Sequence, residues 1–131
     1  MNSKVILDTN ALIWLIADPT KLGSATKSLI NEAETVYFSA VSILEIRIKM
    51  MLGKLQVEGD IIEICKKTGL EELPISAEHA DGIKNLSSRL TSHDPFDRLL
   101  VAQSECEEVK LITSDQFLLK HAPGQTVDAC N

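Results

Sequence analysis

The sequence predicts an α/β fold, in which a mainly parallel central sheet is flanked by helices. Short apolar runs rich in Val, Ile and Leu alternate with helical segments of about ten residues, which is the pattern of strands joined by crossover helices. The chain has 131 residues, of which 44% are hydrophobic, enough to form a core. A domain commonly holds about 100 to 200 residues, so we expect a single domain over residues 1–131.

The beginning of the chain predicts two strands with two helices between them. In order, these are a strand over residues 4–7, helices over 10–17 and 24–33, and a strand over 35–38. Asp18 and Pro19 end the first helix, because proline disfavours helical backbone in the residue before it. Ser24 is the expected N-cap of the second helix.

The middle of the chain predicts two helices and a short strand, over residues 41–52, 60–68 and 70–75. The first helix is apolar on nearly all sides and is followed by Gly53, which indicates a buried helix that ends at a glycine. The strand is only weakly indicated, because Pro74 lacks the N–H group that a sheet requires.

The last part of the chain predicts helices over residues 76–86 and 94–105, a strand over 109–113, a short helix over 116–120 and an edge strand over 126–129. Ser76 and Asp94 are the expected N-caps of the first two, and Pro95 suits the first helical position after Asp94. The pattern leaves the order of the strands open.

Composition and charge exclude several classes of protein. The 19 acidic and 13 basic residues give a net charge of −6, the wrong sign for a protein that holds nucleic acid by overall basicity. The longest uncharged apolar run, over residues 11–17, is shorter than the roughly 20 residues of a membrane span, so no membrane association is expected. The three cysteines form no CxxC pair, which predicts reduced thiols and a cytoplasmic location.

Two acidic residues follow predicted strands. Asp8 comes directly after the first strand, and Asp115 follows the strand over 109–113 and Ser114. The carboxyl ends of parallel strands meet at one edge of a sheet, where ligands bind. Each residue also suits the N-cap of the helix that follows, which is a common role of Asp. The sequence leaves both interpretations open.

Two further acids interrupt apolar helix faces. Glu45 shares a face with Val41 and Ile48, and a buried carboxylate is costly unless it is paired or binds a metal. Lys49, one turn later, offers an ion pair as the alternative. Asp97 begins an apolar face of its helix, although the helix dipole and capping-box geometry also favour an acid in a first turn.

The four acids are expected to converge on one pocket. Carboxylates in close contact repel one another, which raises their pKa values or recruits cations. A set of oxygen donors suits Mg²⁺ or Mn²⁺ rather than zinc. Such ions would offset the negative charge at the place where a phosphate would bind.

Four stretches of this sequence resemble the motifs of a known protein family. They are Leu7-Asp8-Thr9-Asn10, then Ser39-Ala40-Val41-Ser42 with Leu44-Glu45-Ile46, then His93-Asp94-Pro95-Phe96-Asp97-Arg98-Leu99-Leu100, and Leu111-Ile112-Thr113-Ser114-Asp115. In this order they resemble the PIN-domain family, and more narrowly its bacterial VapC-type toxins. The resemblance extends over nearly the whole chain, and the Asp-Pro-Phe-Asp-Arg segment is its most specific part.

The resemblance implies an endoribonuclease that cleaves single-stranded RNA with one or two Mg²⁺ or Mn²⁺ ions, as the toxin of a type II toxin–antitoxin system. It assigns the catalytic and metal-binding positions to Asp8, Glu45, Asp97 and Asp115. The metal would activate a water for in-line attack on the scissile phosphate. A small antitoxin that blocks the site, and a homodimer, are implied in the same way.

Neighbouring residues are candidates for supporting roles. Those at the strand ends would orient carboxylates or water, or serve only as turn and cap residues: Thr9, Asn10, Thr113 and Ser114. Four basic residues would contact phosphate, or form solvated or internal ion pairs: Arg47, Lys49, Lys54 and Arg98.

Two alternatives from other classes remain open. A receiver-like signalling domain also binds Mg²⁺. Domains of that kind carry two acidic residues after the first strand, whereas this chain has Asp8 followed by Thr9 and Asn10. An inactive PIN-fold module would bind a partner without cleaving RNA. Nucleophilic and nucleotide-dependent catalysis are not indicated, since no glycine-rich phosphate loop is recognisable and the histidines show no ligand spacing: His79, His93 and His121.

Overall fold

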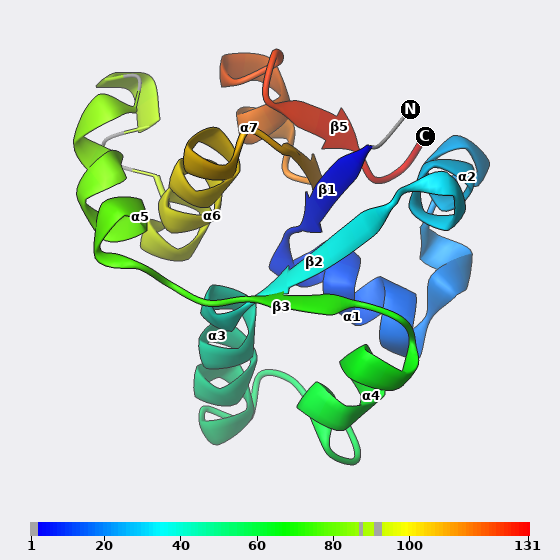
Figure 1. Ribbon diagram of the computed structural model, residues 1–131. Helices are drawn as coiled ribbons and strands as arrows, with labels where there is room; N and C mark the ends of the chain where they lie inside the picture. The colour runs from blue at the N-terminus through cyan, green and yellow to red at the C-terminus, as the bar shows by residue number, and fades with distance from the viewer. Residues whose placement is uncertain (1–2, 87, 91–92) are drawn as a thin grey trace.

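The computed structural model describes residues 3–86, 88–90 and 93–131, and its centre is a sheet of five parallel strands. The strands are β1 (Lys4–Leu7), β2 (Thr35–Ser39), β3 (Glu71–Leu73), β4 (Lys110–Thr113) and β5 (Thr126–Asp128). Their order in the sheet is β3-β2-β1-β4-β5, with β5 at one edge as predicted (Figure 1). The predicted α/β fold is confirmed.

Helices cover both faces of this sheet, with α1 and α2 on one side and α5 and α6 on the other (Figure 1). Their bounds are α1 (Thr9–Ala17), α2 (Ser24–Glu32), α3 (Ala40–Met51), α4 (Ile61–Lys67), α5 (Ala77–Asp81), α6 (Pro95–Glu107) and α7 (Gln116–His121). Three 3-10 turns, η1 (Pro19–Lys21), η2 (Gly82–Asn85) and η3 (Ser88–Leu90), lie between them. Within the described residues, no helix combines the length and the apolar character needed to cross a membrane.

The core consists of two layers, one on each face of the sheet. Alternate side chains of β1 point to opposite faces, so Val5 and Leu7 pack with α1 and α4, whereas Ile6 packs with Leu100 and Leu111. All five side chains are buried. A strand that is buried on both faces holds a fixed position, and β1 thereby fixes the residue that follows it.

A topological switch point lies between β1 and β4. The chain adds β2 and β3 on one side of β1, and later adds β4 and β5 on the other side. At such a point the connections leave in opposite directions and open a crevice outside the carboxyl ends of the strands. The backbone N–H of Asp8 donates to the carbonyl of Ile112 at 2.9 Å, which holds the two strand ends together. This edge is therefore where the fold favours a ligand.

Three local predictions are wrong in detail. Ser24 begins α2, but the N-cap is Gly23, which has no side chain to donate or accept a cap hydrogen bond. The helix predicted over 76–86 ends as α5 at Asp81 and continues as a 3-10 turn. The strand predicted over 70–75 pairs with β2 over only three residues.

The helix predicted to be buried, α3, is buried only in its first half. Val41 and Ile46 are fully buried, whereas Ile48 is 37% exposed, Met51 85% and Leu52, just after the helix, 62%. Figure 1 shows this end of α3 projecting beyond the sheet. Apolar side chains that gather on an exposed helix end indicate an interaction surface.

Gly23 lies where the last residues of the chain pass the start of α2. A Cβ atom at this position would lie 2.0 Å from the backbone carbonyl carbon of Asn131 and 2.4 Å from the carbonyl oxygen of Cys130. We therefore expect Gly23→Ala to lower the free energy of unfolding by about 1 to 3 kcal/mol, the usual cost of overpacking. Chemical denaturation measures it, with Gly124→Ala as the control, because a Cβ there meets nothing within 4 Å. Equal losses in both variants would contradict this account.

Candidate active site

A small polar pocket of about 120 Å³ lies at the carboxyl edge of the sheet, at the switch point between β1 and β4. Its lining is Asp8, Thr9, Asn10, Glu45, Lys49, Asp94, Asp97 and Asp115. All four acids that the sequence indicated are therefore brought to one place, although they are far apart in the chain. The pocket receives them from the ends of β1 and β4 and from the helices α3 and α6.

Asp8 is the most deeply buried of these acids, at 3% exposure. Its Oδ1 accepts from the N–H of Ala11 at 2.8 Å, and its Oδ2 accepts from the hydroxyl of Thr113 at 2.5 Å. The pKa of Asp8 is raised from 3.8 to about 6; burial is the main cause, hydrogen bonds such as that from Thr113 oppose the rise, and the charge of Glu45 adds to it. The capping interpretation of Asp8 is confirmed, and the same carboxylate also faces the pocket.

Glu45 is held by contacts on both carboxylate oxygens. Its Oε1 accepts from the hydroxyl of Thr9 at 2.7 Å, and its Oε2 pairs with the Nζ of Lys49 at 2.5 Å. The predicted ion pair is thus present, although Glu45 also lines the pocket. The pKa of Lys49 is raised, mainly by its hydrogen bond to Glu45 and further by the charges of Asp94 and Asp97, so the ammonium stays charged.

Asp97 carries the strongest sign of crowded negative charge. Burial is the main cause that raises the pKa of this carboxyl, and with the nearby charges of Asp94, Asp8, Asp115 and Glu45 it brings the pKa from 3.8 to about 7. Five carboxylates line a pocket of this size, and Lys49 is the one basic side chain among the described residues of the lining. This charge is poorly compensated, and a divalent cation would compensate it.

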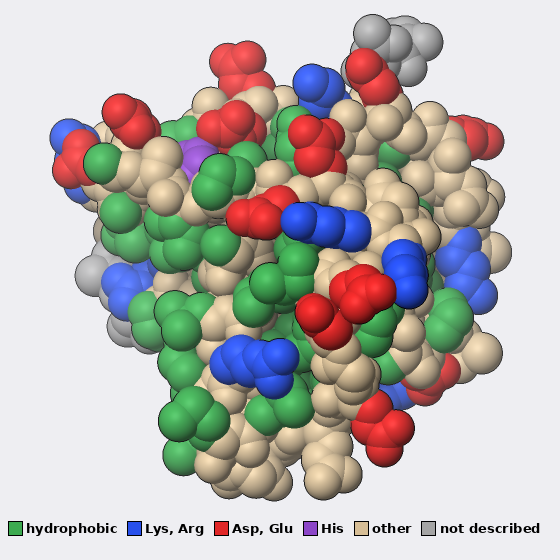
Figure 2. Space-filling view, turned by 60° about the horizontal axis from the view of Figure 1, so that its bottom comes forward, with side chains coloured by type: hydrophobic (Ala, Val, Ile, Leu, Met, Phe, Trp, Pro, Cys, Tyr) green, Lys and Arg blue, Asp and Glu red, His purple; other side chains and the backbone are tan. Residues whose placement is uncertain are grey.

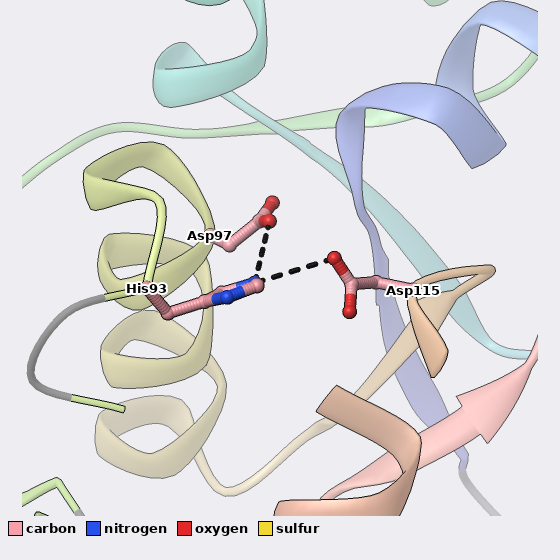
Figure 3. A group of neighbouring side chains, drawn as sticks. All are labelled: His93, Asp97 and Asp115. Carbon is pink, nitrogen blue, oxygen red and sulfur yellow. Dashed lines mark hydrogen bonds and ion pairs between the residues drawn. The ribbon is translucent and has the colours of Figure 1, made fainter. Parts of the chain in front are cut away.

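His93 lies beside these acids, although the spacing of the histidines in the sequence indicated no ligand role. Its Nε2 lies 3.1 Å from Oδ2 of Asp97 and 3.2 Å from Oδ2 of Asp115, and the ring points between the two carboxylates (Figure 3). His93 and Asp97 are four residues apart, which would place them together on a helix. Because α6 begins only at Pro95, His93 lies outside the helix, and the helical spacing does not apply to the pair.

Asp94 is a second residue of the pocket that the sequence analysis assigned only as a cap. It is the N-cap of α6, as predicted, and its Oδ1 accepts from the N–H groups of Phe96 and Asp97 at 2.8 and 3.2 Å. It also lines the pocket and raises the pKa of Asp97. The position of Asp94 close to Asp97 in the sequence could have indicated a place in the pocket, but its role as an N-cap was enough to explain an acid there.

The remaining candidates separate into those at the pocket and those away from it. Asn10 is exposed and lines the pocket, and Ser114 contributes a backbone hydrogen bond to Asp8. The Thr113 hydroxyl also accepts from the N–H of Asp115 at 3.0 Å, so it connects the two strand-end acids. Arg98, which is half-buried on α6, is not in the described lining of the pocket.

The donor set fits a hard divalent cation. Carboxylate oxygens are the preferred ligands of Mg²⁺ and Mn²⁺, and a crowded group of them with raised pKa values gains stability when a cation enters. Asp97, Asp115 and His93 each offer one ligand atom, and these atoms lie within 4.8 Å of one another. The residues present therefore suit the binding of a cation.

The fold and the pocket define a class: a parallel α/β domain with a carboxylate cluster at the switch point of its sheet. The PIN domain profile matches residues 5–122, so this chain belongs to the PIN-domain family. PIN domains are typically nucleases and generally use divalent metal ions. Membership of the family confirms the resemblance in the motifs, and the comparison with curated proteins found no match.

Solved structures share the fold over nearly their full length. DNA-bound VapBC from Salmonella typhimurium matches with a TM-score of 0.71 and 18% identity, over 98% of this chain and 99% of that chain. VapBC2 from Rickettsia felis, bound to a promoter DNA fragment, matches with a TM-score of 0.65 and 16% identity, over 95% of this chain and 97% of that chain. A toxin-antitoxin complex from Klebsiella pneumoniae matches with a TM-score of 0.65 and 19% identity, over 95% of this chain and 97% of that chain. At these identities the likeness establishes the fold.

Proposed function

We propose that this protein is a Mg²⁺- or Mn²⁺-dependent endoribonuclease that cleaves single-stranded RNA as the toxin of a type II toxin–antitoxin system. The observation that carries the proposal is the convergence of Asp8, Glu45, Asp97 and Asp115 on one pocket at the switch point. The raised pKa values of Asp8 and Asp97 support it, because burial, together with the charges of neighbouring carboxylates, disfavours the ionised forms of both groups unless a cation is bound.

The carboxylates of Asp8, Asp97 and Asp115, with Glu45 beside them, would hold the cation. When bound, a divalent ion supplies positive charge for the scissile phosphate and lowers the pKa of a water to the range in which it is a nucleophile at neutral pH. Hydrogen bonds from the Thr113 hydroxyl and the Ala11 N–H, one to each oxygen, fix the orientation of the Asp8 carboxylate. The Asp97 carboxyl, with a pKa of about 7, holds a proton in part of the metal-free molecules and must lose it to act as a ligand.

Lys49 is the basic residue best placed to contact substrate phosphate. Its ammonium lies at the wall of the acidic pocket, where the pair with Glu45 keeps it charged. An RNA phosphate that reaches the pocket would meet this charge beside the cation. This local arrangement offsets a net charge of −6, which otherwise repels nucleic acid. Arg98 keeps only a proposed role in phosphate contact.

Cleavage of a panel of single-stranded RNAs tests the proposal. We expect cleavage with Mg²⁺ or Mn²⁺ and none with EDTA, and products that carry a 5′-phosphate. Equal cleavage with and without EDTA would contradict the metal-dependent mechanism. No cleavage of any RNA, by a protein that binds the metal, would favour the inactive binding module. Membership of the PIN family argues against the receiver-like alternative.

An apolar groove of about 340 Å³ between α3 and α4 is our candidate for the antitoxin contact. Its lining is Phe38, Ala40, Ile43, Leu44, Arg47, Ile62 and Glu72. Hydrophobic side chains also gather on the face of the molecule that carries the lower ends of α3 and α4 (Figure 2), and Leu44 and Met51 are among the exposed large ones. Arg47 and Glu72 at the groove would pair with charged residues of the antitoxin.

Substitution in this groove is expected to separate inhibition from catalysis. Leu44→Glu should weaken antitoxin binding about tenfold or more, because it places a charge in a desolvated apolar contact, and it should leave RNA cleavage intact. Ile75→Glu is the control, since Ile75 is 40% exposed and lies outside the groove. Binding measured by calorimetry, together with rescue of growth by the antitoxin, checks the prediction. Equal binding by Leu44→Glu and the parent protein would place the antitoxin elsewhere.

A further inference from the structure

We propose that His93 is a nitrogen ligand of the cation in the acidic pocket, and that it makes the site selective for Mn²⁺ over Mg²⁺. This inference rests on the proposed function, because it requires that the pocket holds a cation. It differs from the all-oxygen site that the four acids alone would form, since an imidazole nitrogen lies within 3.2 Å of carboxylate oxygens of two of those acids.

The separations between donor atoms match those of a shared metal ion. The Nε2 atom of His93 lies 3.1 Å from Oδ2 of Asp97 and 3.2 Å from Oδ2 of Asp115. Ligands at neighbouring corners of an octahedron with bonds of about 2.1 Å lie about 3.0 Å apart. Little movement of these side chains would therefore be needed for all three atoms to bind one ion.

The ring of His93 is held in the required orientation. It stacks on the ring of Phe117, with centroids 4.7 Å apart and planes 9° apart. Phe117 lies in the first turn of α7, the helix whose N-cap is Asp115. The start of α7 thus supplies one carboxylate ligand and the surface on which the imidazole rests, and Figure 3 shows Asp97, on α6, near the same end of the ring as Asp115.

His93 contacts two carboxylates, and solvent can reach all three side chains. Its side chain is 18% exposed, and those of Asp97 and Asp115 are 20% and 28% exposed, so a cation or a water can reach all three from solvent. A purely structural histidine would be expected to use one nitrogen for one acceptor. Here the Nε2 atom faces two carboxylates that belong to different elements, and it occupies the position between them.

A nitrogen donor changes which metal the site prefers. Mg²⁺ strongly favours oxygen ligands and keeps its waters, whereas Mn²⁺, which also prefers oxygen ligands, is a transition ion that accepts an imidazole nitrogen more readily than Mg²⁺ does. We therefore expect the parent protein to bind Mn²⁺ more tightly than Mg²⁺. His93→Phe should reduce Mn²⁺ affinity about tenfold or more and change Mg²⁺ affinity far less, by analogy with the loss of other metal-supporting residues. The Phe ring preserves the stack on Phe117 and removes both nitrogens.

Pulsed electron paramagnetic resonance of the full chain loaded with Mn²⁺ tests the assignment without relying on activity. The parent protein is expected to show magnetic coupling between Mn²⁺ and a nitrogen nucleus. Histidine labelled with the heavy nitrogen isotope should change that coupling in the otherwise unaltered protein. His93→Phe should abolish the coupling, and His121→Gln should keep it, because in the described part of the chain the candidate metal group contains His93 and not His121. Calorimetric titration with Mn²⁺ and Mg²⁺ gives the two affinities for each variant.

The outcomes separate this inference from the proposed function. Mn²⁺ bound in the pocket with no nitrogen coupling, or with the coupling retained in His93→Phe, would overturn the role of His93 and leave the carboxylate site standing. An unchanged ratio of Mn²⁺ to Mg²⁺ affinity in His93→Phe would overturn the selectivity. Failure of the parent protein to bind either ion would overturn the proposed metal site and the inference together. If His93→Phe does not fold, labelling still tests for a histidine ligand, and within the described residues His93 is the histidine that groups with Asp97 and Asp115.

Discussion

Asp97→Asn is expected to lower the rate of RNA cleavage by about 100-fold or more, the range seen when one group that stabilises charge in a buried site is removed. The same substitution is expected to raise the melting temperature of the metal-free protein. Both effects have one cause. Asp97 lies in a pocket where burial and four neighbouring carboxylates raise its pKa to about 7, so its charge costs stability in the folded state and is useful only when a cation is bound.

The stability gain should depend on pH. The amide that Asp97→Asn introduces resembles the protonated acid, so the variant and the parent differ little at low pH and most at pH 8, where the parent carries the charge. Thermal unfolding in EDTA measures this, with a gain of a few degrees at pH 8. Asp81→Asn is the control, because Asp81 forms an exposed ion pair with Lys84 on the surface. Cleavage at the parent rate, or a lower melting temperature at pH 8, would show that Asp97 has only a structural role.

The metal-free protein is expected to lose stability as the pH rises from about 4 to about 7. The pKa values of Asp8 and Asp97 in the folded state, about 6 and about 7, lie above the value of 3.8 expected in the unfolded chain. The folded state therefore keeps its protons to higher pH, and the stability that is present below the unfolded pKa is lost as the pH passes the folded values. Each pKa unit corresponds to about 1.4 kcal/mol, so Asp8 alone accounts for about 3 kcal/mol.

Addition of Mn²⁺ should reverse this loss. An ion that binds only the folded state stabilises it by about 2.7 kcal/mol at 100 times its dissociation constant. Chemical denaturation at pH 5 and pH 8, with EDTA or with Mn²⁺, measures both effects. The double variant Asp8→Asn with Asp97→Asn should show a flatter pH profile and little response to Mn²⁺. A parent protein whose metal-free stability rises between pH 5 and pH 8 would contradict the raised pKa values.

Much of this site was predictable because each residue lies in a local pattern. Asp8 directly follows an apolar strand and Asp115 comes two residues after another, and the geometry of parallel sheets brings the ends of such strands to one edge. Glu45 and Asp97 stand out as acids on apolar helix faces, and the structure places both at the pocket. The alternation of strands and helices predicted the α/β class for the same reason. The hydrophobic patterns of a strand and of a helix can each be recognised within a few residues.

The features that were not predictable depend on contacts between distant segments. The strand order β3-β2-β1-β4-β5 is set by pairing between residues far apart in the sequence, and no local pattern encodes it. His93 reaches Asp115 only because the loop before α6 and the start of α7 meet across the pocket. The exposed second half of α3 has the composition of a buried helix, because the sequence shows that a face is apolar but not which molecule covers it.

Anomalous X-ray scattering from crystals soaked with Mn²⁺ tests the central claim most directly, because it locates the ion without reference to activity. The account predicts a strong peak within bonding distance of carboxylate oxygens of Asp97 and Asp115, inside the pocket that Asp8 and Glu45 also line. Asp97→Asn crystals should lose most of that peak. Saturating Mn²⁺ that leaves this pocket empty, or binds only at surface carboxylates elsewhere, would contradict the account.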